Sequence, residues 1–267
     1  MSNELIAAVV QAGIVGAGGA GFPTHVKLNA KADTVIINGA ECEPLLRVDQ
    51  QLMALKAEKM LTALDWIVEH VGATLVYLDV ARCGIKEASA DLAAAKGLST
   101  LYLSDNSITN LDSAIYSLDK LTYINLDRNG LTALPDGISG LKSLKWLRLN
   151  NNKLSSLPAD MGELKNIKRL YLNKNEFTSV PEVIKQMTSL EELSLGGNKI
   201  TDFPEWLCEM PNLKRIDLYG NPIKSVPDKV VNMPSLTTLV MDNCLLENER
   251  KLELNKKLAD KRIKFIF

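Results

Sequence analysis

A 23-residue repeat constrains the fold of this chain more than any other feature of its sequence. Segments of the form L-x-x-L-x-L-x-x-N-x-L, such as "LKWLRLNNNKL", recur without any change in spacing. Their first residues are Leu98, Leu121, Leu144, Ile167, Leu190, Leu213 and Leu236, and an eighth copy begins 23 residues earlier at Leu75. One repeat cannot bury its apolar side alone, so the pattern predicts a solenoid in which stacked repeats share a continuous core.

A polar column occupies the ninth position of the repeats. It contains Asn106, Asn129, Asn152, Asn175, Asn198 and Asn221, with Cys83 in the first copy and Cys244 in the last. An asparagine side chain can hydrogen-bond the backbone of the turn that follows each strand. A cysteine can fill the same buried position, so we interpret Cys83 and Cys244 as structural rather than as metal ligands or redox groups.

With these features the chain resembles the leucine-rich repeat family, and its half-repeats such as "LPDGISGLKSL" resemble the bacterial and intracellular members. The resemblance covers residues 75–246 and implies an α/β solenoid of eight 23-residue repeats, with a parallel β-sheet on its concave face. Residues 247–267 are expected to form a capping helix and strand. Residues 1–74 are expected to form a small α/β segment that caps the other end, with helical spacing of apolar residues between Leu52 and Val68.

Aromatic and arginine side chains gather at the repeat positions that should face the concave side. Strand residues alternate between core and solvent, and five of the six tyrosines fall in the outward columns. Tyrosine, tryptophan and arginine dominate binding hot spots, which favours a face for a protein or peptide, although aromatic residues also favour strands for structural reasons. The predicted partner-binding residues are Tyr77, Tyr102, Tyr123, Trp146, Arg148, Arg169, Tyr171, Arg215 and Tyr219.

Other functions have little support in the repeats. They contain no histidine and no serine, histidine and acid set, so we expect no catalytic residues there. The net charge is −1, and acidic residues interrupt any basic stripe, which argues against nucleic acid. The four cysteines are far apart and form no C-x-x-C, which argues against a metal site and favours a reducing, cytoplasmic location. We expect no membrane span, and a monomer.

The N-terminal region carries a different signature. "GIVGAGGAGFPTHVKL" followed by "VIINGAECEPLLRVDQQLM" resembles the start of the flavin- and NADH-binding fold of the Rnf complex C subunit. It is also similar to cobalamin reductases of propanediol-use microcompartments and, more distantly, to the flavoprotein subunit of respiratory complex I. The resemblance covers residues 4–73.

The resemblance implies a role for each matching residue. Gly16, Gly18, Gly19, Ala20 and Gly21 match the loop whose amides surround the FMN phosphate and ribityl groups, where side chains would block close approach. Phe22 and Lys27 match residues that flank the nucleotides, and Asn38 matches a flavin contact. Glu41 and Glu43 match an acidic pair near flavin and NADH. Ala40 replaces the aspartate of the complex I relatives.

The departures from the flavoprotein family leave three hypotheses. The family's fold continues further and carries a cysteine-rich iron–sulfur segment, whereas this chain enters its repeats at a junction between residues 73 and 97. The first hypothesis is a non-catalytic binding module that uses the concave face and holds no cofactor. The alternative is an FMN-dependent electron-transfer protein that oxidises NADH and docks its partner through the repeats. The third is a stable fusion without an evolved activity.

Overall fold

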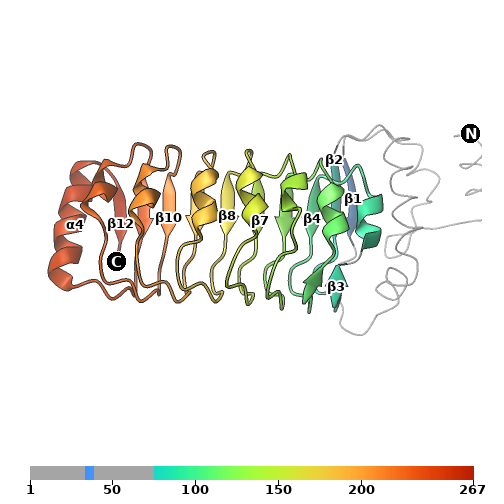
Figure 1. The fold of residues 1–267 in the computed structure, drawn as a ribbon, viewed down its shortest axis with the longest axis horizontal. Helices are drawn as coiled ribbons and strands as arrows, with labels where there is room; N and C mark the ends of the chain where they lie inside the picture. The colour runs from blue at the N-terminus through green and yellow to red at the C-terminus, as the bar shows by residue number, and fades with distance from the viewer. Residues whose placement is uncertain (1–33, 39–74, 89) are drawn as a thin grey trace, which may run out of the picture.

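Short parallel strands lie side by side along the length of the molecule (Figure 1). The computed structural model describes residues 34–38, 75–88 and 90–267. A ten-stranded parallel sheet contains β1 (Thr34–Asn38), β2 (Leu75–Asp79), β4 (Thr100–Tyr102), β6 (Tyr123–Asn125), β7 (Trp146–Arg148), β8 (Arg169–Tyr171), β9 (Glu192–Ser194), β10 (Arg215–Asp217), β11 (Thr238–Val240) and β12 (Lys264–Ile266). A second, two-stranded sheet joins β3 (Glu87–Ala88) to β5 (Asn110–Leu111).

The register of the large sheet follows the sequence repeat. Tyr123 pairs with Trp146, and Trp146 pairs with Arg169, so equivalent repeat positions stand side by side. The eight strands from β2 to β11 in this sheet supply one strand for each of the eight repeats, which confirms the predicted leucine-rich repeat solenoid. The sheet is longer than the repeat by one strand at each end, because β1 pairs with β2 and β12 pairs with β11.

Seven short 3₁₀ helices form a second layer over the strands (Figure 1). They are η1 (Ala90–Ala94), η2 (Ser113–Ser117), η3 (Ile138–Gly140), η4 (Ala159–Glu163), η5 (Glu182–Gln186), η6 (Glu205–Glu209) and η7 (Asp228–Asn232). A proline precedes each of the last four helices, with φ of −65° at Pro158 and −60° at Pro181. The pyrrolidine ring fixes this angle, so the "LP" and "VP" pairs of the sequence prepare the chain for the turn.

The core lies between the strand layer and the helix layer. In the fourth described coil Leu144, Leu147, Leu149 and Leu154 are all at most 1% exposed, and the same four repeat positions are buried in the neighbouring coils. Burying a leucine side chain contributes about 1.5–3 kcal/mol relative to leaving it exposed. Because every coil supplies such a set, the apolar core runs unbroken from one end of the repeats to the other.

The asparagine column satisfies backbone groups between adjacent coils. The Asn152 Nδ2 donates to the carbonyl oxygens of Leu126 at 3.0 Å and Leu149 at 3.1 Å, and its Oδ1 accepts from the Leu131 N–H at 3.1 Å. The Cys244 thiol donates to the Leu218 carbonyl at 3.2 Å, which is the equivalent contact in the last slot of the column. The hydrogen bonding expected of this column is therefore confirmed.

Every coil contains one residue with a left-handed backbone conformation, at the eighth repeat position. The residue just before the asparagine column has a positive φ in all eight repeats, from 54° at Lys174 to 65° at Gly197. Six of the eight positions carry a side chain, namely Arg82, Asp105, Arg128, Asn151, Lys174 and Asn243. This conformation costs about 1 kcal/mol for a residue with a Cβ, so the stacked coils must compensate the cost in each repeat.

A helix and a strand close the C-terminal end. Helix α4 (Asn248–Asp260) packs against β12 and η7 and buries Leu254 and Leu258. Arg250 ties the helix to the last coil, because its Nη2 donates to the Val226 carbonyl at 2.8 Å and to the Asp228 carboxylate at 2.7 Å. The helical stretch expected near residues 52–68 and most of the expected N-terminal cap lie outside the described residues.

Candidate functional site

The concave face of the sheet carries two rows of side chains, one on each side of the buried central strand position. Strand alternation puts residues i and i+2 on the same face, and the register aligns them from coil to coil. The first row contains Tyr77, Thr100, Tyr123, Trp146, Arg169, Glu192, Arg215 and Thr238. The second row contains Asp79, Tyr102, Asn125, Arg148, Tyr171, Ser194, Asp217 and Val240.

Three aromatic side chains contact one another across three successive coils. The Tyr102 and Tyr123 ring centroids are 5.1 Å apart, and the Tyr123 and Trp146 centroids are 5.8 Å apart with an edge-on geometry. Trp146 remains 38% exposed, which is unusual for so large an apolar side chain. Aromatic pairs at these separations prefer tilted and edge-on arrangements, so the rings support one another while keeping a surface open to solvent.

Two arginines continue the aromatic stretch toward the C-terminal coils. The Arg169 guanidinium carbon lies 4.1 Å from the Trp146 ring centroid, while its Nε donates to the Glu192 carboxylate at 2.9 Å. The Arg148 guanidinium carbon lies 5.4 Å from the Tyr171 centroid, and its Nε donates to the Asp127 carboxylate. Each arginine is therefore held from two sides, by an aromatic ring and by a carboxylate.

Acidic side chains fix this cluster in one geometry. Asp127 is only 1% exposed, and it accepts from the Arg148 Nε at 2.8 Å and from the Asn150 N–H at 2.8 Å. The Tyr171 hydroxyl donates to the Glu192 carboxylate at 2.8 Å. Burial and this hydrogen bond raise the pKa of Tyr171 to about 12, so the phenol stays a donor at neutral pH.

Six of the nine predicted partner-binding residues thus form one contiguous set. We call the set the central ladder; its members are Tyr102, Tyr123, Trp146, Arg148, Arg169 and Tyr171. Asp127 and Glu192, which hold the arginines of this set, are not among the predicted partner-binding residues. The 23-residue offset could have identified Glu192, which stands one repeat after Arg169 in the same column, whereas Asp127 is 21 residues from Arg148 and belongs to a different column.

The other three predicted residues are not members of the central ladder. Tyr77 stands on β2 at the N-terminal end, two residues before Asp79. Arg215 lies 3.4 Å from the Asp217 carboxylate on its own strand. The Tyr219 ring packs directly on Gly196, where a Cβ would come within 2.0 Å of it. Arg215 and Tyr219 thus make contacts of their own, whereas Tyr77 lies within electrostatic range of Tyr102 at the N-terminal end of the ladder.

The predicted flavin-binding residues are, with one exception, outside the described residues. That exception is Asn38, which ends β1 and pairs in register with Asp79 of β2. The role of Asn38 as a flavin contact stays a prediction. Nine residues remain predictions: Gly16, Gly18, Gly19, Ala20, Gly21, Phe22, Lys27, Glu41 and Glu43.

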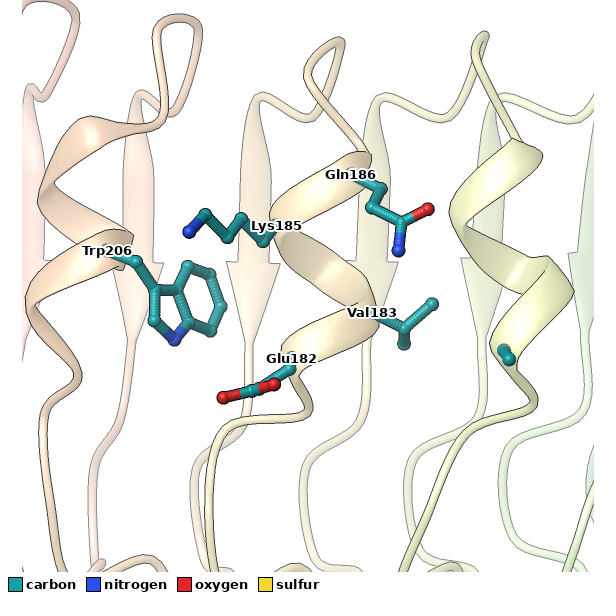
Figure 2. A pocket seen from close by; sticks show the side chains of 6 residues that line it. Glu182, Val183, Lys185, Gln186 and Trp206 are labelled. Atoms are coloured by element: carbon teal, nitrogen blue, oxygen red, sulfur yellow. The ribbon is translucent and has the colours of Figure 1, made fainter.

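A shallow pocket of about 340 Å³ opens among the short helices, on the side of the solenoid that carries them (Figure 2). Trp206 of η6 lies on one side of it, and Val183, Glu182 and Lys185 of η5 lie beside it. This pocket was not predicted, because its lining side chains, such as Trp206 and Val183, are not set by the repeat pattern.

The repeated coils and the parallel sheet together define the fold as a leucine-rich repeat solenoid. The family described as a leucine-rich repeat region matches residues 115–214, and the family described as the Nuo51 FMN-binding domain matches residues 9–108. The chain therefore joins a leucine-rich repeat solenoid to an N-terminal region that is similar to flavoproteins. The two matched ranges do not overlap, but the FMN-binding-domain match extends through β2 and β4, which are the first two strands of the repeats.

Curated relatives match about a quarter of this chain. Over 62 residues the chain is 58% identical to the cobalamin reductase PduS of Citrobacter freundii, which covers 23% of this chain and 14% of that protein. Over 76 residues it is 49% identical to the C subunit of the Na⁺-translocating ferredoxin:NAD⁺ oxidoreductase complex of Acetobacterium woodii, covering 27% of this chain and 17% of that protein. The chain thus spans less than a fifth of the length of these relatives.

Solved structures match the solenoid. A leucine-rich repeat protein of Leptospira interrogans superposes with a TM-score of 0.60 at 24% identity, covering 76% of this chain and 57% of that one. The ectodomain of the Arabidopsis thaliana receptor kinase GASSHO1/SCHENGEN3 gives a TM-score of 0.55 at 27% identity, covering 66% of this chain and 22% of that one. In the described part of the chain, no helix has the length and apolar character that a bilayer span requires.

Proposed function

We propose that this chain is a non-catalytic binding module that captures an extended peptide segment of a partner protein on its concave face. The observation that carries the proposal is the central ladder, in which Tyr123, Trp146 and Arg169 stack in sequence and Trp146 stays 38% exposed. A related fold supports it, since the GASSHO1/SCHENGEN3 ectodomain was solved in complex with Casparian strip integrity factor 2. Cys208 and Cys244 are buried and form no disulfide within the described part of the chain, which is compatible with the proposed cytoplasmic location.

Preorganisation makes this surface suited to binding. Ordering a long side chain at an interface costs about 0.5–1.5 kcal/mol, and the arginines of the ladder are already held by Asp127 and Glu192 before a partner arrives. The same pairing neutralises their charge. The face therefore offers aromatic surface and polar edges rather than a basic patch, which favours peptide contacts over phosphate contacts.

The test uses the whole chain and a displayed library of random peptides of about 12 residues, which span about 40 Å when extended. We expect enriched peptides whose affinity falls about thirtyfold for Trp146→Ala and for Tyr123→Ala, as hot-spot truncations do. Trp206→Ala is the matched control, because it removes a tryptophan from the helix side and should leave affinity unchanged. Failure to enrich any peptide, or retained binding by Trp146→Ala, would overturn the proposal.

A second candidate function rests on the N-terminal matches, and we propose it as the alternative. Residues 9–108 match an FMN-binding domain, and β1 lies in register beside β2 with Asn38 at its carboxyl end. Gly16, Gly18, Gly19, Ala20 and Gly21 would hold the FMN phosphate and ribityl groups, flanked by Phe22 and Lys27. Asn38 would contact the flavin, and Glu41 and Glu43 would orient NADH.

The chemistry that FMN supplies when bound is acceptance of a hydride from NADH. The test is a visible absorption spectrum of the purified protein, before and after incubation with FMN and passage over a desalting column. A retained flavin band that NADH bleaches would support the electron-transfer function. A protein that leaves the column without flavin, and shows no flavin as purified, would exclude it.

A further inference from the structure

One carboxylate on the concave face differs from the others. Glu192 pairs with Arg169, and Asp217 pairs with Arg215. Among the strand acids that the structure describes on this face, Asp79 alone has no arginine or lysine partner. Its Oδ1 accepts a hydrogen bond from the Ala81 N–H at 3.0 Å, which leaves Oδ2 available to another donor.

Tyrosines stand on the same face at the coil of this carboxylate and at the next two coils. Tyr77 lies two residues before Asp79 on β2 and therefore on the same face, and Tyr102 is its register partner on β4. Tyr123 follows, with its ring centroid 5.1 Å from that of Tyr102. The pKa of Tyr102 is raised by burial and then by the nearby Tyr77 and Asp79, which places all three groups within electrostatic range.

The cations of the neighbouring coils are occupied elsewhere. The Arg82 Nε lies 3.8 Å from the Asp105 carboxylate, and Arg128 pairs with the same carboxylate. Arg148 pairs with Asp127. Among the residues that the structure describes, no cation pairs with the half-buried Asp79 carboxylate, whereas Glu192 and Asp217 each have an arginine partner.

We propose that Tyr77, Asp79, Tyr102 and Tyr123 form a site for one lysine or arginine side chain of the bound peptide. The inference rests on the proposed peptide-binding function and adds its specificity. The carboxylate would pair with the cation, and the ring faces would contact it through cation–π interactions. The bound peptide should therefore carry a lysine or arginine where it contacts the N-terminal end of the concave face.

Sheet geometry also fixes where that residue stands in the peptide. Asp79 and Tyr102 are three and two strands from Trp146 in the sheet order, which corresponds to about 10–14 Å. An extended peptide advances about 3.3 Å per residue. The basic residue should therefore stand about three or four residues from the aromatic or aliphatic side chain that contacts Trp146.

The test selects two displayed random-peptide libraries against the full chain, one with lysine and arginine and one without. We expect enriched peptides from the first library to carry a basic residue at that spacing. Replacing it by citrulline or norleucine, or introducing Asp79→Asn, should each weaken binding about tenfold. Asp217→Asn is the matched control, because this acid already has a partner, and it should change affinity by less than about twofold.

The outcomes separate the two claims. Peptides that depend on Trp146 but show no basic enrichment, or that bind Asp79→Asn equally well, would overturn the cation site and leave the peptide-binding face in place. Peptides that bind independently of Trp146, or no enrichment from either library, would overturn the face and the cation site together.

Discussion

The guanidinium of Arg169 lies over the indole of Trp146, with 4.1 Å between its central carbon and the ring centroid. The two residues are 23 positions apart and stand side by side in neighbouring strands. Arg169 is held in this position by Glu192, which also accepts a hydrogen bond from the Tyr171 hydroxyl. The exposed tryptophan therefore owes its fixed orientation to charges placed one and two coils further along the sheet.

This contact should be measurable as a coupling free energy. In a double-mutant cycle of Trp146→Ala and Arg169→Ala, we expect urea unfolding to give a coupling of about 0.5–1 kcal/mol, typical of a partly exposed cation–π pair. The control cycle pairs Trp146→Ala with Arg215→Ala, since Arg215 occupies the same row on β10 without contacting the indole. Equal coupling in both cycles would mean that the stacking does not contribute.

The asparagine column should carry a large share of the stability of each coil. Asn152→Ala removes three donated contacts and one accepted bond at a side chain that is 7% exposed, and leaves buried backbone groups unpaired. We expect a loss of about 2–4 kcal/mol in the free energy of unfolding, measured by urea denaturation. The exposed Asn166 donates once, to the Lys142 carbonyl at 2.8 Å, so Asn166→Ala should cost less than about 1 kcal/mol.

The solenoid could be predicted from the sequence because each coil repeats one local solution. Leucine at four repeat positions and asparagine at a fifth specify which side chains are buried. The constant spacing then brings adjacent coils into register. Concave-face positions follow from strand alternation, so Tyr123, Trp146 and Arg169 could be placed side by side without coordinates. The three-residue strands are too short for propensity alone to locate them.

Other features depend on contacts that no periodic pattern encodes. The sequence predicts Asp127 to be a solvent-exposed acid, yet its side chain is almost fully buried. Its carboxylate accepts hydrogen bonds from Arg148 and from the Asn150 N–H. The addition of β1 to the sheet joins residues 41 positions apart, such as Thr34 and Leu75, outside the 23-residue spacing. The helix-side pocket at Trp206 arises from side chains that differ between repeats.

The ion pair of Asp105 with Arg128 should make stability depend on acid pH. The Arg128 hydrogen bond holds the pKa of Asp105 below its ordinary value of 3.8. Because the folded-state pKa is depressed, the stabilisation is present above the unfolded pKa and is lost as the pH falls through the folded pKa. The pair is partly exposed, so the difference between wild type and Asp105→Asn should be at most about 1 kcal/mol at neutral pH.

This difference should shrink as the pH falls below 3.8, and urea unfolding at a series of pH values measures it. Asp119→Asn serves as the control, because this exposed acid forms no ion pair with the residues that the structure describes. A difference for Asp105→Asn that stays constant across the acid range would show that the carboxylate charge is not the stabilising feature.

The left-handed backbone at the eighth repeat position predicts opposite effects on stability for two substitutions, one that removes a glycine and one that introduces it. Gly220 has a φ of +63°, and a Cβ there would meet only the Gly197 backbone at an ordinary 3.7 Å. Gly220→Ala therefore imposes the backbone cost without a clash, and we expect a loss of about 1 kcal/mol. Lys174 has a φ of 54° two repeats earlier, so Lys174→Gly relieves the same cost.

Glycine also gains entropy in the unfolded chain, which offsets part of that relief, so Lys174→Gly should be neutral or stabilising by up to about 1 kcal/mol. Midpoints of urea unfolding, followed by circular dichroism, measure both variants in the same background. Opposite signs for the two substitutions would follow from a left-handed backbone at both positions. Stabilisation by Gly220→Ala together with destabilisation by Lys174→Gly would instead require an ordinary right-handed or extended backbone there, because alanine is favoured over glycine in those conformations.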